Sequence, residues 1–167
     1  MKEQATDQGL RGALAGLLPD LRAFARFLCG SAQEADDLVQ ESLARTLRSL
    51  DAREEPVEDL RAWCLATIRN TFHEGLRARK REQARLQQVV PDPPSPPPQE
   101  TPGQIRDLAQ ALKELPPLLR EAVILVGAQG MSHQQAAAIC KVPVGTMKAR
   151  VSRARKLLAV ALGRVTA

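Results

Sequence analysis

Aromatic residues are scarce in this chain of 167 residues, where phenylalanine, tryptophan and tyrosine together make up 2% of the sequence. A core must therefore be built from Leu, Ala, Val and Ile, which favours helices over a β-sheet. No apolar run approaches twenty residues, which argues against a membrane span. The first ten residues also lack the apolar segment of a signal peptide. The sequence predicts an all-α protein that stays in the cytoplasm and makes no membrane contact.

Cysteine and histidine are also too few and too scattered to form a chemical site. The three cysteines, Cys29, Cys64 and Cys140, lie far apart and fit neither a disulfide framework nor a zinc motif. The two histidines, His73 and His133, accompany no nucleophile pattern, and no Gly-rich phosphate loop is present. We therefore expect no enzyme activity, no metal, no cofactor and no small-molecule substrate.

Acidic residues are missing from the C-terminal end. The last one is Glu121, and seven basic residues follow it. From Gly9 to Leu86 the chain has 13 Lys and Arg against 12 Asp and Glu, whereas from Gln104 to Ala167 the numbers are 10 and 3. A basic surplus confined to one end is typical of a phosphate-binding surface.

Proline is concentrated in one place, since seven of the twelve prolines lie between Val89 and Gly103. Proline removes a backbone donor and fixes φ, so this stretch suits an extended spacer rather than a helix. We predict two domains, 9–86 and 104–167, joined by a Pro-rich linker at 87–103. At about 3.1 Å per residue, fifteen residues of this kind reach about 45 Å.

The N-terminal domain has the apolar spacing of three helices. The first lies around Leu21 to Leu28, the second follows a predicted N-cap at Ser31, and the third spans roughly Asp59 to Arg81. The face of the second helix opposite its apolar stripe is acidic and polar. Its members are Asp36, Asp37, Gln40 and Glu41.

The C-terminal domain is predicted to hold four short helices. Ser132 and Gln135 form a capping box for a helix over His133 to Cys140, and the turn KVP leads into a helix over Val144 to Leu162. A short helix, a tight turn and a basic helix make a helix-turn-helix, whose second helix enters the DNA major groove.

The final helix carries the predicted DNA contacts. Its apolar underside is formed by Met147, Val151, Ala154 and Leu158. Small residues near its N-terminal end allow close approach to DNA. Lys148 and Arg153 are expected to reach base edges, and Arg150, Arg155 and Lys156 to contact phosphates. The full predicted set is Thr146, Lys148, Ala149, Arg150, Ser152, Arg153, Arg155 and Lys156.

Three segments resemble one known family. LLREAVILVGAQGMSHQQAAAICKVPVGTMKARVSRARKLL resembles the promoter-recognition domain of extracytoplasmic-function (ECF) sigma factors. ADDLVQESLARTLRSL resembles their polymerase-docking helix, and RAWCLATIRNTFHEGLRARKR resembles the helix pair that reads the −10 promoter element. LRAFARFLCG is most similar to the general-stress-response subgroup, often called EcfG. The resemblance implies a sigma-2-like helical bundle followed by a sigma-4-like helix-turn-helix.

The resemblance also implies partners and residue roles. The acidic face would dock on the clamp helices of core RNA polymerase, the second domain would meet the flap, and an anti-sigma factor would regulate the protein. Asn70 would hold a flipped base of the −10 element beside the loop Ala52 to Asp59, and the C-terminal domain would read a GGAA-type −35 element. Phosphate contacts beside the −10 element would come from Arg77, Arg79, Lys80 and Arg81. Trp63 and Phe72 resemble core residues more than stacking platforms, which implies limited melting power.

Two alternatives remain open at this point. One is a sigma-like decoy that sequesters an anti-sigma factor without binding DNA, although such a protein would be expected to lose the basic helix. The other is a stand-alone helix-turn-helix regulator, which would usually need a dimer interface that the sequence does not suggest.

Overall fold

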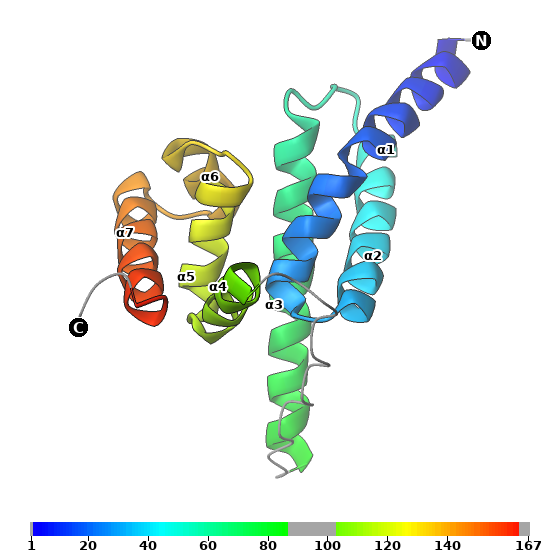
Figure 1. Cartoon of the computed structure of the whole chain (residues 1–167). Coiled ribbons are helices and arrows are strands. Elements are labelled where there is room, and N and C mark those ends of the chain that lie inside the picture. Colours follow the sequence, from blue (N-terminus) through cyan, green and yellow to red (C-terminus); the bar gives the residue numbers. More distant parts are fainter. Residues whose placement is uncertain (1, 87–102, 164–167) are drawn as a thin grey trace.

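A computed structural model describes the backbone of residues 2–86 and 103–163, and side chains within 8–86 and 103–163 except that of residue 104. Throughout this part of the chain the regular structure is helical, which confirms the all-α prediction. Figure 1 shows two bundles side by side, one formed by the first three helices and the other by the rest. The predicted linker lies outside the described residues, except that its last residue, Gly103, begins a helix.

The N-terminal bundle consists of α1 (Lys2–Cys29), α2 (Ala32–Asp51) and α3 (Leu60–Leu86). Apolar side chains at helical spacing fill its centre, and Leu21, Phe24 and Leu65 are completely buried. Gly30 adopts a left-handed φ of 79° between α1 and α2, a conformation that glycine adopts without strain. Ser31 then accepts a hydrogen bond from the Glu34 backbone N–H, which confirms the predicted N-cap.

Two helices of this bundle are longer than the sequence predicted. The first continues through Pro19 and starts at Lys2, and α3 runs five residues beyond Arg81 to Leu86. Apolar spacing marks only the packed part of a helix. The stretch from Arg77 to Leu86 makes up almost three turns of α3, and its side chains are exposed. This end of the helix extends beyond the bundle and therefore carries no such pattern (Figure 1).

The C-terminal bundle consists of α4 (Gly103–Glu114), α5 (Pro117–Val123), a π-helical turn η1 (Ile124–Ala128), α6 (His133–Cys140) and α7 (Val144–Ala161). The predicted capping box is present, because the Gln135 N–H donates to the Ser132 hydroxyl at 3.1 Å and the Ser132 N–H donates to the Gln135 side chain at 2.9 Å. Lys141 ends α6 in the left-handed conformation, with φ 54°, and so makes the tight turn into α7. The resulting helix-turn-helix matches the predicted one.

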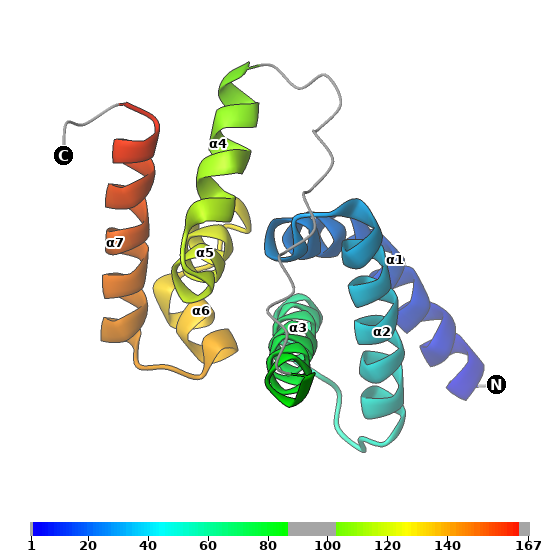
Figure 2. The same ribbon diagram turned by 90° about the horizontal axis from the view of Figure 1, so that it is seen from below.

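The two bundles pack directly against each other. Figure 2 shows α5 and α6 between α7 on one side and α3 on the other, while α2 lies on the far side of the N-terminal bundle. Helix α3 contacts α6, and α1 contacts α4, α5 and η1. This packing sets which charged surfaces face solvent and which are covered.

Candidate nucleic-acid interface and interdomain site

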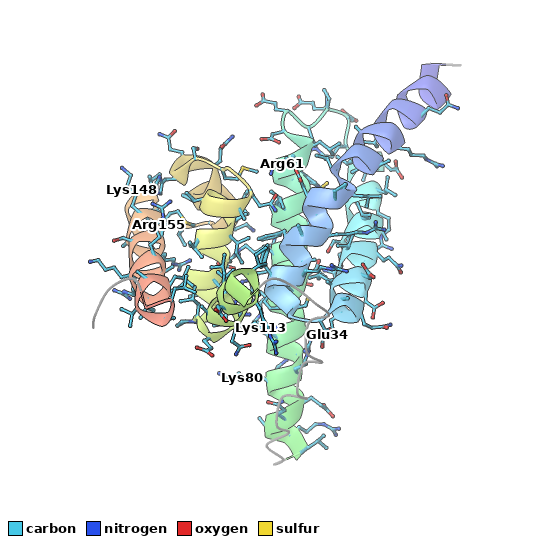
Figure 3. All side chains as sticks on the ribbon, in the orientation of Figure 1. Glu34, Arg61, Lys80, Lys113, Lys148 and Arg155 are labelled. Carbon is cyan, nitrogen blue, oxygen red and sulfur yellow. The ribbon has the colours of Figure 1, made fainter. Side chains whose placement is uncertain are left out.

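The outer face of α7 is a continuous polar and cationic strip. Its underside is buried through Met147, Val151, Ala154 and Leu158, as the helical spacing predicted. Most of the predicted contact residues are exposed on the opposite side: Thr146, Lys148, Ala149, Ser152, Arg153, Arg155 and Lys156. Lys148 and Arg155 are labelled on this helix in Figure 3. Packing thus separates an apolar face from a basic one on a single helix.

Arg150 is the exception among these residues, because its side chain turns inward and is only 19% exposed. Its Nη1 lies 3.8 Å from a carboxylate oxygen of Glu121 on α5. In this arrangement Arg150 is therefore not part of the exposed strip, and a contact to phosphate would require its guanidinium to leave Glu121.

A second basic surface covers the free end of α3. Arg77, Arg79, Lys80 and Arg81 are all exposed there, and Lys80 is labelled along the projecting part of the helix in Figure 3. Arg79 lies 3.6 Å from Glu34, an exposed pair that contributes little to stability. Asn70 is half-buried and lies closer to the N-terminal end of the same helix.

The loop between α2 and α3 is tied to α3 at two points. Asp59 accepts a hydrogen bond from the Ala62 N–H at 2.9 Å and so caps the helix. The guanidinium of Arg53 lies 5.0 Å from the ring centre of Trp63, a cation–π contact that holds the loop over the helix. Trp63 is half-buried rather than fully buried, so it is less of a core residue than its sequence context suggested.

The acidic face of α2 is exposed as predicted from its spacing, with Asp36, Asp37, Gln40 and Glu41 all in contact with solvent. Glu41 accepts a hydrogen bond from Arg45 at 2.7 Å, and Arg45 also pairs with Glu74 on α3. Because α2 lies on the side of the N-terminal bundle away from the C-terminal bundle, the docking of the two bundles leaves this face uncovered (Figure 2).

The most deeply buried charge of the described chain lies where the bundles meet. Glu121 of α5 is completely buried, and three cationic or polar side chains converge on it; we call this group the Glu121 cluster. Arg69 of α3 donates two hydrogen bonds, at 3.0 and 3.1 Å, and His73 Nε2 lies 2.6 Å from the second carboxylate oxygen. Arg150 completes the cluster from α7. One carboxylate thus joins helices from both bundles.

The electrostatics of the cluster favour the ionised carboxylate. Burial by itself raises the pKa of Glu121, but hydrogen bonds from His73 and Arg69 and the charges of the same two residues outweigh it, so the pKa lies below its usual value of 4.5. Cys140 of α6 is beside this site, and burial, assisted by the negative charge of Glu121, raises the pKa of its thiol to about 12. Cys140 is therefore a buried thiol, not a reactive one.

Two other arginines connect the bundles through backbone carbonyls. Arg61 of α3 donates to the carbonyl and side chain of Gln129 at 2.7 and 2.8 Å, and it also bonds Asp20 on α1 at 3.2 Å. Arg120 donates to the Leu28 carbonyl at the end of α1, at 3.3 Å, as well as to carbonyls at the end of α4. Helix C-termini present unpaired carbonyls and partial negative charge, which explains why an arginine binds there.

Sequence reasoning missed this interdomain site. Arg69 and Glu121 are 52 positions apart, and no short-range pattern links them. The sequence contained only an indirect sign of this site, because Glu121 is an acidic residue among the apolar residues of α5, which are buried. Among the described side chains no group of His, Cys, Asp and Glu could hold a metal ion, and no described helix is long and apolar enough to cross a membrane.

Comparison with known proteins identifies both bundles. Residues 14–82 match the Sigma-70 region 2 family, and residues 105–158 match the Sigma-70 region 4 family. The ECF RNA polymerase sigma factor EcfG of Rhodopseudomonas palustris (strain TIE-1) is 43% identical over 154 residues, which cover 92% of this chain and 84% of that protein.

Solved structures give the same result. The sigma factor RpoE, in complex with the anti-sigma factor NepR from Bartonella quintana, matches 96% of this chain and 99% of its own, with a TM-score of 0.80 and 37% identity. CnrH, in complex with the cytosolic domain of CnrY, has the same fold, with a TM-score of 0.68 over 96% of this chain and 91% of that chain, at 24% identity.

Proposed function

Because this chain belongs to the ECF family of RNA polymerase sigma factors, it acts in stress-response transcription initiation, and we propose that three exposed surfaces divide the work. The acidic face of α2 docks on the clamp helices of core RNA polymerase. The basic end of α3 contacts the −10 element, and the outer strip of α7 contacts the −35 element. The C-terminal bundle meets the polymerase flap.

The observation that best supports this assignment is the strip on α7. A helix-turn-helix presents its second helix to the major groove, and here that helix is apolar underneath and cationic outside. Lys148 and Arg153 are exposed and are the proposed contacts to base edges, where Arg can hold guanine through two hydrogen bonds. Arg155 and Lys156 suit phosphates. The small residues Ala149 and Ser152 allow the backbone to approach the groove.

Asn70 and the α2–α3 loop are proposed to receive a flipped −10 base. Extruding a base costs a few kcal/mol of stacking, which a pocket must recover. Aromatic rings commonly stack on unpaired bases, and near this loop the half-buried Trp63 already has Arg53 over its ring. We therefore expect this base to be held mainly by hydrogen bonds and the protein to need a well-matched promoter.

Promoter binding also requires the domains to separate. Two elements about two turns of DNA apart are roughly 70 Å from each other at 3.4 Å per base pair. In the structure, α7 is separated from α3 by the layer of α5 and α6 (Figure 2). The distance from α7 to α3 is therefore about two helix-to-helix spacings of 8–10 Å each, or only about 20 Å. A linker of about 45 Å plus the dimensions of the domains covers the difference.

We further propose regulation by an anti-sigma factor and a cytoplasmic location, where core polymerase acts. The support is that the RpoE structure similar to this chain contains the anti-sigma factor NepR. A GGAA-type −35 element is the proposed target sequence. The proposed domain limits are 9–86 and 104–167.

Run-off transcription tests the proposed function. Purified core RNA polymerase would be supplied with a promoter carrying a GGAA-type −35 element, with and without this protein. We expect a transcript that depends on the protein. Stable polymerase binding without a transcript would contradict the proposed promoter, and neither polymerase binding nor a transcript would instead favour the sigma-like decoy.

A further inference from the structure

Arg150 is the one predicted DNA contact of α7 whose side chain is not exposed. Only 19% of that side chain is accessible, and its Nη1 atom is buried without a hydrogen-bond partner in the described chain. Burying a charged group is costly unless an opposite charge lies near it. Glu121 of α5 supplies that charge, with a carboxylate oxygen 3.8 Å from Nη1. The carboxylate therefore determines the inward direction of the Arg150 side chain.

A phosphate contact by Arg150 would compete with this ion pair. The other partners of Glu121, Arg69 and His73, lie on α3 of the N-terminal bundle. Arg150 and Glu121 both lie in the C-terminal bundle, so the pair needs no residue of the other bundle. It is available in the closed chain, whose bundles are packed as in Figure 2, and in an open chain, whose bundles are apart. Turning to DNA would deprive the carboxylate of a partner in return for an attraction that salt screens.

The ion pair lies where it can fix the rotation of α7 about its axis. Arg150 is next to Val151 and about one turn from Met147 and Ala154, so it borders the buried face. Apolar contacts are non-directional, whereas an ion pair has a defined geometry. A rotation of about 20° moves the surface of a helix, about 5–6 Å from its axis, by about 2 Å. A shift of that size breaks a hydrogen bond of about 3 Å to a base edge.

We propose that Arg150 is a positioning residue of the −35 interface. Paired with Glu121, it fixes the orientation in which α7 presents Lys148 and Arg153 to the bases, and it does not contact phosphate itself. This inference rests on the proposed function of the outer strip of α7. Loss of Arg150 lowers the discrimination between DNA sequences, because misaligned side chains lose base contacts. It leaves the number of phosphate contacts, and so the salt dependence of binding, unchanged.

Two variants of Arg150 and two comparison variants test this role. Arg150→Met removes the charge and keeps the apolar stem, whereas Arg150→Lys keeps a charged donor for Glu121 but loses the planar guanidinium. Arg155→Met changes an exposed arginine of the same helix that is a proposed phosphate contact. Arg22→Met is the control without effect, because Arg22 is an exposed arginine of α1 outside all the proposed contact surfaces. Thermal melting by circular dichroism verifies that each variant is folded at the temperature of the titrations.

The readout is the affinity of the full-length chain for two duplexes of equal length, each titrated at several salt concentrations. One duplex carries the GGAA-type −35 element, and the other carries the same bases in scrambled order. We expect Arg150→Met to lower the ratio of the two affinities about tenfold, the effect of losing about one good base contact. Its affinity for scrambled DNA and its slope of log affinity against log salt stay at wild-type values, and Arg150→Lys restores part of the ratio. Arg155→Met weakens binding to both duplexes equally and reduces the slope by about 0.9.

Two results would overturn the proposal. Equal weakening on both duplexes, with a slope reduced by about 0.9, would make Arg150 a phosphate contact. A wild-type ratio and slope in Arg150→Met, with only a lower melting temperature, would limit its role to stability. A wild-type chain that does not prefer the −35 element over scrambled DNA is a different result, which would contradict the proposed function of the outer strip of α7 itself.

Discussion

Replacing Glu121 by glutamine is the most informative single change, because it removes one charge and almost no volume. The wild-type carboxylate receives hydrogen bonds from two α3 side chains and has Arg150 beside it at 3.8 Å. Glutamine retains one acceptor oxygen but leaves the arginines without a buried counter-charge. Breaking a buried ion pair typically costs 3–5 kcal/mol, and we expect the lower end, about 3 kcal/mol, because the partners can reach water when the bundles part.

The sole tryptophan allows the two bundles to be followed separately. Trp63 lies in α3, so its fluorescence reports the N-terminal bundle, whereas far-ultraviolet circular dichroism reports all helices. At about 2–4 °C per kcal/mol, Glu121→Gln should lower the main thermal transition by about 6–12 °C. The fluorescence and circular dichroism transitions should also occur at different temperatures. The variant lacks the buried charge that couples the two bundles, so the chain no longer unfolds in a single two-state transition.

Acid provides an independent test of the same charge. Since the folded-state pKa of Glu121 lies below its usual value of 4.5, its stabilisation is fully present above pH 4.5 and is lost as the pH falls below that value. The stability difference between wild type and Glu121→Gln should therefore shrink in this range.

Glu114→Gln is the matched control, since it changes an exposed carboxylate of α4 that accepts an i,i+4 hydrogen bond from Gln110. We expect it to alter stability by less than about 0.5 kcal/mol. If Glu121→Gln melts like the wild type, or if its deficit stays constant with acidification, the cluster does not stabilise the closed chain and the reasoning is refuted.

Three other predictions concern single positions. Arg153→Ala should cost about 1–3 kcal/mol of discrimination between a −35 element and scrambled DNA in a titration; equal losses on both DNAs would make Arg153 a phosphate contact. Asp37→Arg should weaken binding to core polymerase about tenfold or more, because it places like charges against basic clamp helices; an unchanged affinity would contradict the docking assignment. Ser132→Ala should remove about 1 kcal/mol through loss of the capping box and lower the melting temperature by about 2–4 °C, whereas an unchanged melting temperature would show that α6 is held by packing alone.

Local signals in the sequence were sufficient to predict the helical elements. Ser31 and the Ser132–Gln135 pair each mark the start of a helix by a pattern that spans only four residues. Both make the predicted hydrogen bonds. The apolar underside of α7 follows from spacing alone, and all four of its predicted core positions are buried.

The interdomain arrangement could not be predicted in this way. It depends on which faces of α3 and α5 meet, and the contacts that decide it join residues 48 to 109 positions apart. Arg150 shows the consequence, because the sequence predicted a phosphate contact for it and could not reveal that a carboxylate oxygen of Glu121 lies 3.8 Å from its guanidinium. A predicted basic contact residue can thus belong to the interior once an acid from another helix is present.

The polar contacts between the bundles have one further consequence, which comes from the chain that joins them. A tether of this length keeps the two bundles at an effective concentration on the order of millimolar with respect to each other. An interface with a dissociation constant near that value is therefore balanced between closed and open, and each 1.4 kcal/mol gained or lost changes the balance tenfold. Contacts too weak to hold two separate proteins together can thus determine how much of this chain is available to a promoter.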